Sequence, residues 1–330
     1  MPRILLAMNG PKLRDQLLPD RLVQRLRAVG EVDLDLVASD FATVSDHVLG
    51  ETSVIFGGWG VKRLDATVLD RMPRLGLVAY AAGSVKGFAT DELFDRGITL
   101  TTAAAANGVP VAEWTHALIT LANKNFLTGV EIYRRGERRG GEFDRYGNVD
   151  RTVGIIGASL IGRDVLNRLR GQPLRILLSD PTIDPAVAAG LGAELVDLDT
   201  LMASADVVSL HAPILPSTIG MIGANQIRSM QDGATFINTA RGVLVDHDAL
   251  RAELATGRIS AMLDVTHPEP LTPDDPMRSM PNVLLTPHLA GSQGLEVRRM
   301  AEYAVDEVER WSTGRPPRYE VTRAALARMA

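Results

Sequence analysis

The 330-residue sequence contains no cysteine and carries no excess of positive charge. Without cysteine, the chain has no disulfides, thiolate nucleophiles, iron–sulfur clusters or cysteine-rich zinc sites, and it fits a reducing compartment. A net charge of −5 argues against nucleic acid as a partner. Apolar residues make up 45% and charged residues 23%, which indicates a globular chain, and the length favours about two domains.

Long apolar runs are also missing. The best candidate, Leu75–Val85, is interrupted by Gly and Ser and falls short of the roughly 20 residues that a membrane span needs. The N-terminal run Ile4–Met8 is shorter than the roughly 7–15 residues of a signal sequence core. We therefore predict a cytoplasmic protein that contacts no membrane and holds no metal. Its chemistry must come from His, carboxylates, Arg, Lys, hydroxyls or a cofactor.

Short apolar runs alternate with helical patterns along the whole chain, which predicts an α/β protein with parallel sheets. The first half offers the strand candidates Ile4–Met8, Val32–Val37, Val54–Phe56, Leu75–Ala81 and Ile98–Thr101. One long helix is expected over Pro110–Arg134, followed by a loop rich in glycine and charge. The second half offers the candidates Val153–Gly157, Arg175–Ser179, Ala193–Val196, Val207–Leu210, Thr235–Asn238, Met262–Val265 and Val283–Leu285. From these we expect the six strands of a doubly wound nucleotide-binding domain.

A glycine-rich turn follows the predicted strand that begins at Val153. It reads Gly157-x-Ser159-x-x-Gly162, which is the dinucleotide fingerprint with Ser in place of the second Gly. Asp180 ends the next strand, 18 residues after Gly162, where an acidic residue binds the ribose hydroxyls. Because a carboxylate repels a 2′-phosphate, we predict NAD and not NADP. The alternatives are a glycine-rich turn beside a surface Asp, or cofactor binding weakened by Ser159.

Three further segments place polar residues after predicted strands: Gly233–Gly242, Leu263–Leu271 and Leu285–Gly291. Ligands bind at the carboxyl ends of strands in open α/β sheets. The segments contain Arg241, Glu269 and His288, and surface residues in ordinary loops are the alternative interpretation. His267 precedes Glu269 by two residues and is expected to be a loop residue.

Together with the glycine-rich turn, these segments resemble the D-isomer-specific 2-hydroxyacid dehydrogenases along nearly the whole chain. The resemblance implies that His288 exchanges a proton with the substrate oxygen while Glu269 bonds the other ring nitrogen and favours the imidazolium. It also implies that Arg241 pairs with the substrate carboxylate and that Asp264 holds the nicotinamide carboxamide. In the related formate dehydrogenases a Gln takes the place of Glu269, so this residue argues against formate oxidation.

The resemblance implies further binding residues. Those for the cofactor are Gly157, Ser159, Leu160, Ile161, Gly162, Asp180, Pro181, His211, Pro213, Thr218, Thr239, Ala240 and Asp264. Those for the substrate are Trp59, Gly83, Ser84 and Arg241. His211 is expected to line the cofactor cleft without reacting.

The resemblance also implies a domain layout. Residues 1–117 and 291–330 would form a discontinuous, flavodoxin-like substrate (catalytic) domain, and residues 118–290 a Rossmann-type NAD-binding domain, with the active site in the cleft. A homodimer would form through the long helix and the loop after it, using Phe126, Ile132 and Tyr133.

The function predicted on this basis is an oxidoreductase that transfers a hydride between NAD(H) and a small 2-hydroxy/2-oxo acid, such as a glyoxylate or hydroxypyruvate type of reductase. We expect a non-phosphorylated substrate, although Lys62, Arg63 and Lys86 lie near the predicted substrate residues in sequence. The alternative is an NAD-responsive binding or regulatory protein of the same fold without significant turnover, since fold alone does not decide function.

Overall fold

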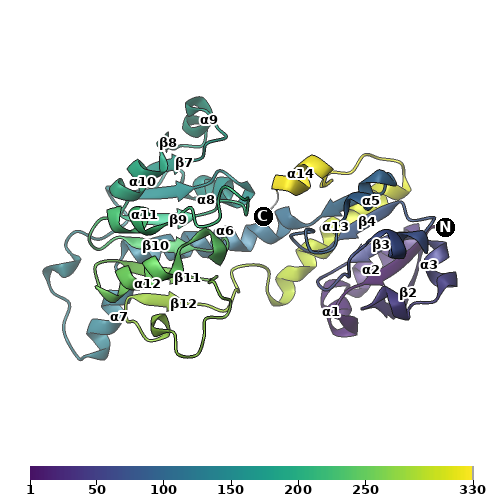
Figure 1. Ribbon diagram of the computed structural model, residues 1–330, viewed down its shortest axis with the longest axis horizontal. Coiled ribbons are helices and arrows are strands. Elements are labelled where there is room, and N and C mark those ends of the chain that lie inside the picture. The colour runs from purple at the N-terminus through teal and green to yellow at the C-terminus, as the bar shows by residue number, and fades with distance from the viewer. Residues whose placement is uncertain (329–330) are drawn as a thin grey trace. The chain divides into compact units, whose positions relative to one another are not determined.

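The computed structural model describes residues 1–328. The chain divides into two compact units (Figure 1). One unit combines Met1–Gly108 with the segment that begins at Ser292, and the other is Val109–Gly291. The division falls between residues 108 and 109, inside helix α6 (Ala104–Asn123). The predicted domain boundary lies further along the same helix, after residue 117. Both units are built on a parallel sheet, which confirms the predicted α/β class.

The first unit holds a five-stranded parallel sheet in the order β2-β1-β3-β4-β5, which is the flavodoxin-like order. Its strands are β1 (Arg3–Ala7), β2 (Glu31–Ala38), β3 (Thr52–Gly57), β4 (Leu77–Tyr80) and β5 (Thr99–Thr102). Its helices are α1 (Gly10–Leu17), α2 (Asp20–Val29), α3 (Asp46–Glu51), α4 (Ala66–Asp70), α5 (Asp91–Asp95), α13 (Val297–Ser312) and α14 (Arg323–Arg328). Helix α13 comes from the far end of the sequence, so this unit is discontinuous.

Both faces of this sheet are covered. Leu6 of β1 packs in a cluster with residues of α1, α2 and α13, whereas its neighbours Leu5 and Ala7 pack in a second cluster with residues of α3, α4 and α5. Successive side chains of a strand point to opposite faces. This double coverage explains why the strands β1, β3 and β4 contain continuous apolar runs in the sequence, whereas the edge strand β2 alternates apolar with acidic residues.

The second unit holds a seven-stranded parallel sheet in the order β12-β11-β10-β9-β6-β7-β8, a doubly wound Rossmann-type sheet (Figure 1). Its strands are β6 (Arg151–Ile156), β7 (Leu174–Ser179), β8 (Glu194–Leu195), β9 (Val207–Leu210), β10 (Thr235–Asn238), β11 (Ser260–Leu263) and β12 (Val283–Leu285). All seven candidates form strands, so the expected number of six is wrong. The helices are α6, α7 (Phe126–Arg134), α8 (Leu160–Leu169), α9 (Pro185–Gly190), α10 (Leu198–Ser204), α11 (Ala224–Ser229) and α12 (His247–Ala255).

The prediction of a single helix over Pro110–Arg134 is wrong in two ways. Helix α6 begins earlier, at Ala104, and carries Pro110 in its interior. It ends at Asn123, and α7 begins at Phe126 after Asn125, whose φ of 52° places it in the left-handed region. Asn tolerates this conformation better than most residues do, and a single residue there interrupts a right-handed helix.

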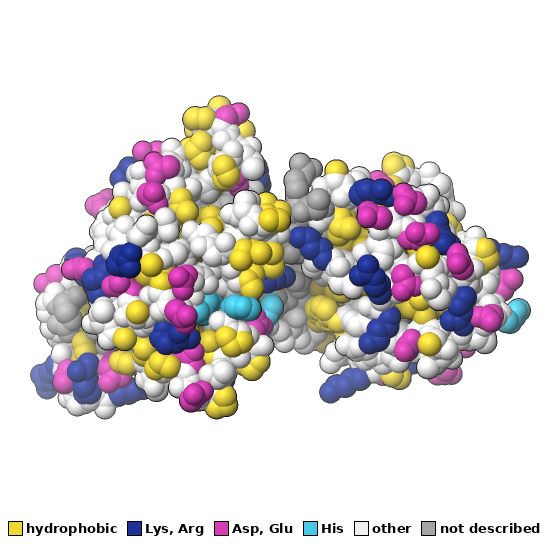
Figure 2. Space-filling view, in the orientation of Figure 1, with side chains coloured by type: hydrophobic (Ala, Val, Ile, Leu, Met, Phe, Trp, Pro, Cys, Tyr) yellow, Lys and Arg dark blue, Asp and Glu magenta, His cyan; other side chains and the backbone are white. Residues whose placement is uncertain are grey.

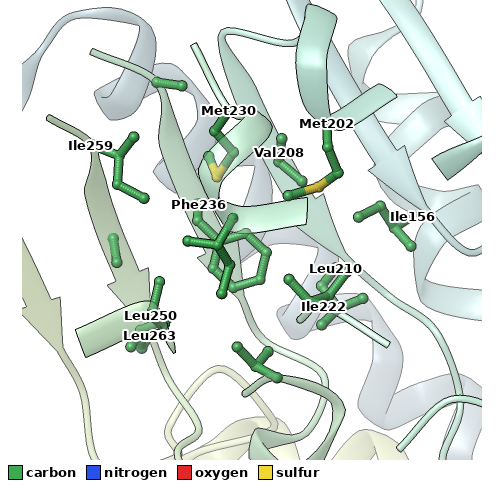
Figure 3. Packing of buried hydrophobic residues seen from close by; sticks show 14 of the residues in the cluster. Ile156, Met202, Val208, Leu210, Ile222, Met230, Phe236, Leu250, Ile259 and Leu263 are labelled. Atoms are coloured by element: carbon green, nitrogen blue, oxygen red, sulfur yellow. The ribbon is translucent and has the colours of Figure 1, made fainter. Parts of the chain in front are cut away.

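Phe236 of β10 lies at the centre of the core on one face of this sheet. Figure 3 shows its ring among Met202, Met230, Val208 and Leu250, which belong to the same buried cluster. The opposite face is covered by α6, α8 and α9 through a separate buried cluster. The carboxyl ends of the strands are left for loops, and these loops carry the predicted site residues. Within residues 1–328, no helix is both long enough and apolar enough to cross a membrane.

Candidate active site

The glycine-rich turn links β6 to α8. Gly157 has a φ of +95°, and a Cβ on it would lie 2.8 Å from the amide nitrogen of Ala212. A Cβ on Gly162 would lie 2.1 Å from the carbonyl oxygen of Gly157. Each position therefore requires glycine, the first for its backbone conformation and both for close packing. Such a turn at the start of a helix leaves backbone amides for the phosphates of a dinucleotide.

Ser159 stands where the fingerprint has its second glycine. Its backbone is extended, with φ −63° and ψ 175°, so a side chain causes no strain there. Its Oγ accepts a hydrogen bond from the amide of Gly162 at 3.3 Å and caps helix α8. Because the oxygen is the acceptor, the hydroxyl proton is available for a phosphate oxygen. Leu160 follows in the first turn of α8 with 54% of its surface exposed, and Ile161 is half-buried.

Asp180 follows β7 and reaches the glycine-rich turn. Its Oδ2 accepts from the amide of Ala158 at 2.7 Å, and its Oδ1 accepts from the amide and the hydroxyl of Thr182 at 2.8 and 2.6 Å. Burial alone would raise the pKa of Asp180, but these hydrogen bonds outweigh it, and the net result is a lowered pKa. The carboxylate is therefore ionised at neutral pH. Pro181 beside it is exposed.

His211 follows β9 and is almost fully buried, with 4% exposed. Its Nε2 lies 2.8 Å from the hydroxyl of Ser209, and burial lowers its pKa to about 4. The ring is therefore neutral at physiological pH and has a packing role beside Gly162. Thr218 closes the loop that follows, because its hydroxyl donates to the carbonyl of Pro213 at 2.6 Å.

Asn238 holds the turn that carries Arg241. The Asn238 side chain is buried, donates to the carbonyl of Arg241 at 3.0 Å and accepts from the amide of Ala240 at 2.9 Å. Thr239 is fixed separately, by a hydroxyl contact of 2.9 Å with Thr115 of α6. Sequence reasoning did not select Asn238, although its place at the end of a strand and within the same motif was a usable signal.

Arg241 is partly buried at the same edge of the sheet. Its Nη1 donates to the carbonyl of Ala240 at 2.6 Å. Burial lowers the pKa of Arg241, and the charge of Glu269 opposes that shift, so the two side chains lie within each other's field. The guanidinium remains charged, because its ordinary pKa is far above neutrality.

His288 and Glu269 form a pair across two loops. His288 Nδ1 lies 2.6 Å from Glu269 Oε1, and the two side chains are 48% and 40% exposed. Because Nδ1 faces the carboxylate, Nε2 is the nitrogen left for a ligand. Figure 2 shows histidine side chains in cyan beside acidic side chains on the surface of this unit, in the region of β11 and β12.

Asp264 holds the turn of His288 in place. The Asp264 side chain is buried, and its Oδ1 accepts from the hydroxyl of Thr286 at 2.6 Å and the amide of Leu289 at 2.9 Å. Its Oδ2 accepts from the amide of Ala290 at 2.9 Å. The backbone amide of His288, which has a φ of 54°, donates to the carbonyl of Asp264 at 3.0 Å. Both carboxylate oxygens thus have partners within the chain, and the contact with a nicotinamide carboxamide stays a prediction.

The remaining substrate residues lie in the first unit. Trp59 follows β3 and is 37% exposed. Its backbone carbonyl accepts a hydrogen bond of 2.7 Å from the amide of Asn9. Gly83 and Ser84 follow β4, and the carbonyl of Gly83 accepts from the hydroxyl of Thr102. All three lie beyond the carboxyl ends of their strands, and their contact with substrate stays a prediction.

The comparison with protein families decides the relationship. The family description "D-isomer specific 2-hydroxyacid dehydrogenase, NAD binding domain" matches residues 116–290. The chain belongs to this family. It is therefore related to oxidoreductases, and Val109–Gly291 contains an NAD(P)-binding domain.

Curated relatives of this family member include two kinds of enzyme. A glyoxylate reductase from Korarchaeum cryptofilum is 34% identical over 262 residues, which cover 77% of this chain and 78% of that protein. A D-3-phosphoglycerate dehydrogenase from Archaeoglobus fulgidus is 31% identical over 260 residues, which cover 78% of this chain and 49% of that protein. The chain thus spans about half the length of the phosphoglycerate dehydrogenase that it matches.

Solved structures give the same two kinds of relative. A phosphoglycerate oxidoreductase from Rhizobium etli has a TM-score of 0.82 at 25% identity and covers 99% of this chain and 100% of that one. An NADPH-dependent glyoxylate/hydroxypyruvate reductase from Sinorhizobium meliloti has a TM-score of 0.76 at 25% identity and covers 100% and 99%. Neither the substrate nor the choice between NAD and NADP follows from these matches.

Proposed function

We propose that the protein transfers a hydride between NAD(H) and a small, non-phosphorylated 2-hydroxy/2-oxo acid. The observation that supports this most directly is the 2.6 Å pair of His288 Nδ1 and Glu269 Oε1, in a unit that also carries Arg241 and the glycine-rich turn. An imidazole oriented by a carboxylate is a suitable proton donor and acceptor near neutral pH.

Each residue has one task in the proposed reaction. Arg241 pairs with the substrate carboxylate, because its planar guanidinium presents parallel donors to two oxygens. His288 donates a proton from Nε2 to the carbonyl oxygen during reduction and accepts the hydroxyl proton during oxidation. Glu269 holds the ring through Nδ1 and stabilises its positive charge. When bound, NADH would supply the hydride for C2 of the 2-oxo acid.

A panel of 2-oxo acids tests this function. With NADH, we expect turnover of glyoxylate, hydroxypyruvate or pyruvate, measured as loss of absorbance at the NADH band. Slow turnover of these together with fast turnover of the 2-oxo form of 3-phosphoglycerate would contradict the non-phosphorylated assignment. Saturable NADH binding without turnover of any acid would favour the NAD-responsive binding protein instead.

Asp180→Asn tests the preference for NAD. The substitution keeps a side-chain oxygen for the amide of Ala158 but removes the negative charge, and with it the charged acceptor that we propose for the ribose hydroxyls. We expect the Kd for NADH to rise about 10–100-fold, since hydrogen bonds to charged groups contribute roughly 1.5–3 kcal/mol. The Kd for NADPH should fall, because the carboxylate no longer repels the 2′-phosphate. Fluorescence titration measures both constants, and an equal change for the two cofactors would contradict the assignment.

We also propose a homodimer formed through α7 and the following loop. Phe126 and Tyr133 of α7 are 39% and 85% exposed, so this helix offers two aromatic side chains to a partner. The cytoplasmic location likewise stays a prediction.

A further inference from the structure

The buried histidine His247 has no part in the proposed chemistry, yet both of its ring nitrogens are engaged. His247 begins α12 and is 7% exposed. Its Nδ1 lies 3.1 Å from the carbonyl oxygen of Val245, and its Nε2 lies 3.2 Å from the amide nitrogen of His267, which donates to it. An amide N–H can only donate, so Nε2 carries no proton and Nδ1 carries the one that reaches Val245. The contacts therefore require the neutral ring in its Nδ1–H form.

The amide that donates to His247 belongs to the loop that carries Glu269. This loop leaves β11, passes through Thr266 and His267, and returns to the buried Leu271. Gly242 packs directly on the same peptide, because a Cβ there would lie 2.0 Å from the carbonyl oxygen of Thr266. The peptide between Thr266 and His267 is thus held by Gly242 and by the ring of His247. Two residues later, Glu269 meets His288.

We propose that His247 is a positioning residue for the Glu269–His288 pair, which it serves by holding the backbone of the Glu269 loop. This inference rests on the proposed function, since it explains how the carboxylate that orients the catalytic histidine is itself kept in place. Arg241 precedes Gly242, which packs on the peptide between Thr266 and His267. This contact therefore joins the Arg241 turn to the Glu269 loop.

The surroundings of His247 favour the neutral ring. Burial lowers its pKa, and the positive fields of His267 and Arg251 lower it further. The carbonyl of Val245 and the carboxylate of Asp275 act in the opposite direction, but Asp275 is itself paired with Arg251 at 2.7 Å. The net pKa lies below the ordinary value of a histidine, so Nε2 remains an acceptor at neutral pH.

Two variants separate positioning from packing. His247→Gln keeps a side-chain acceptor that can reach the His267 amide, whereas His247→Leu fills the space without one. We expect kcat to fall about 10–100-fold in His247→Leu, because a misplaced catalytic group costs up to about 100-fold, and to stay within about threefold in His247→Gln. The Kd for NADH should be unchanged in both. His116→Leu is the matched control: it removes a half-buried histidine of the same unit, whose Nε2 lies 2.7 Å from Gln172, and its kcat should match that of the unmodified protein.

A second readout does not depend on turnover. Nitrogen-15 NMR of the histidine rings reports which nitrogen carries the proton. In the unmodified protein with both rings neutral, we expect His247 and His288 in the Nδ1–H form. In His247→Leu, His288 should shift towards the Nε2–H form as Glu269 moves away. Equal kcat in His247→Leu and His247→Gln, or an unchanged His288 signal in His247→Leu, overturns the inference. The expected NMR pattern in a protein that turns over no 2-oxo acid overturns the proposed function alone.

Discussion

Replacing His288 with alanine should lower kcat for reduction of a 2-oxo acid by about 10²–10⁴-fold, the usual contribution of a positioned acid–base residue. The reason is the loss of the proposed proton donor: Glu269 faces Nδ1 of His288, which leaves Nε2 for the substrate oxygen. Steady-state kinetics with NADH and the best acid of the panel would measure the effect.

The controls for His288→Ala use residues with other tasks. The Kd for NADH should not change, because Asp180 and the glycine-rich turn belong to other loops. Glu269→Gln should reduce kcat less than His288→Ala does, since its amide oxygen still accepts the Nδ1 proton although the charge is gone. Turnover that survives His288→Ala unchanged would remove His288 from the mechanism.

Arg241→Lys should lower kcat/KM for the 2-oxo acid by about 100-fold, which corresponds to one charged hydrogen bond of roughly 1.5–3 kcal/mol. Lysine keeps the charge but loses the planar pair of donors that matches a carboxylate. It also loses the Nη1 contact of 2.6 Å with the carbonyl of Ala240, which holds the guanidinium at this edge of the sheet.

Arg228→Lys is the matched control for Arg241→Lys. Arg228 lies in the same unit, and its exposed side chain donates to Asn225 within α11 at 2.7 Å, so its exchange should leave kcat/KM unchanged. The Kd for NADH should be equal in both variants and in the unmodified protein. A fall in kcat/KM for Arg228→Lys as large as that for Arg241→Lys would mean that loss of an arginine anywhere in the unit disturbs the enzyme.

The central strands were predictable because both faces of each sheet are covered, which makes these strands short apolar runs between polar loops. The break between α6 and α7 was not. Apolar residues continue at helical spacing across Lys124 and Asn125, and the left-handed backbone of Asn125 has no strong signal in periodicity.

The candidate site shows the same division. Gly157, Gly162 and Asp180 stood out because a phosphate-binding turn needs those residue types at that spacing. The partners of Asp180 and Asp264 did not stand out. Each carboxylate accepts hydrogen bonds from backbone amides of a neighbouring loop, and any loop supplies such amides whatever its sequence. His247 gives no signal in the sequence for the same reason, because its partners are the backbone groups of Val245 and His267.

By itself, the sequence determined which chemistry is available: no thiol, several histidines, and polar residues placed after apolar runs. The order of the strands determined which of these residues meet. In the sheet β10, β11 and β12 are neighbours, so the loops that follow them carry Arg241, Glu269 and His288 to one edge. The contact between His288 and Glu269 spans 19 residues of sequence, and only the parallel alignment of β11 and β12 brings their following loops within hydrogen-bond distance.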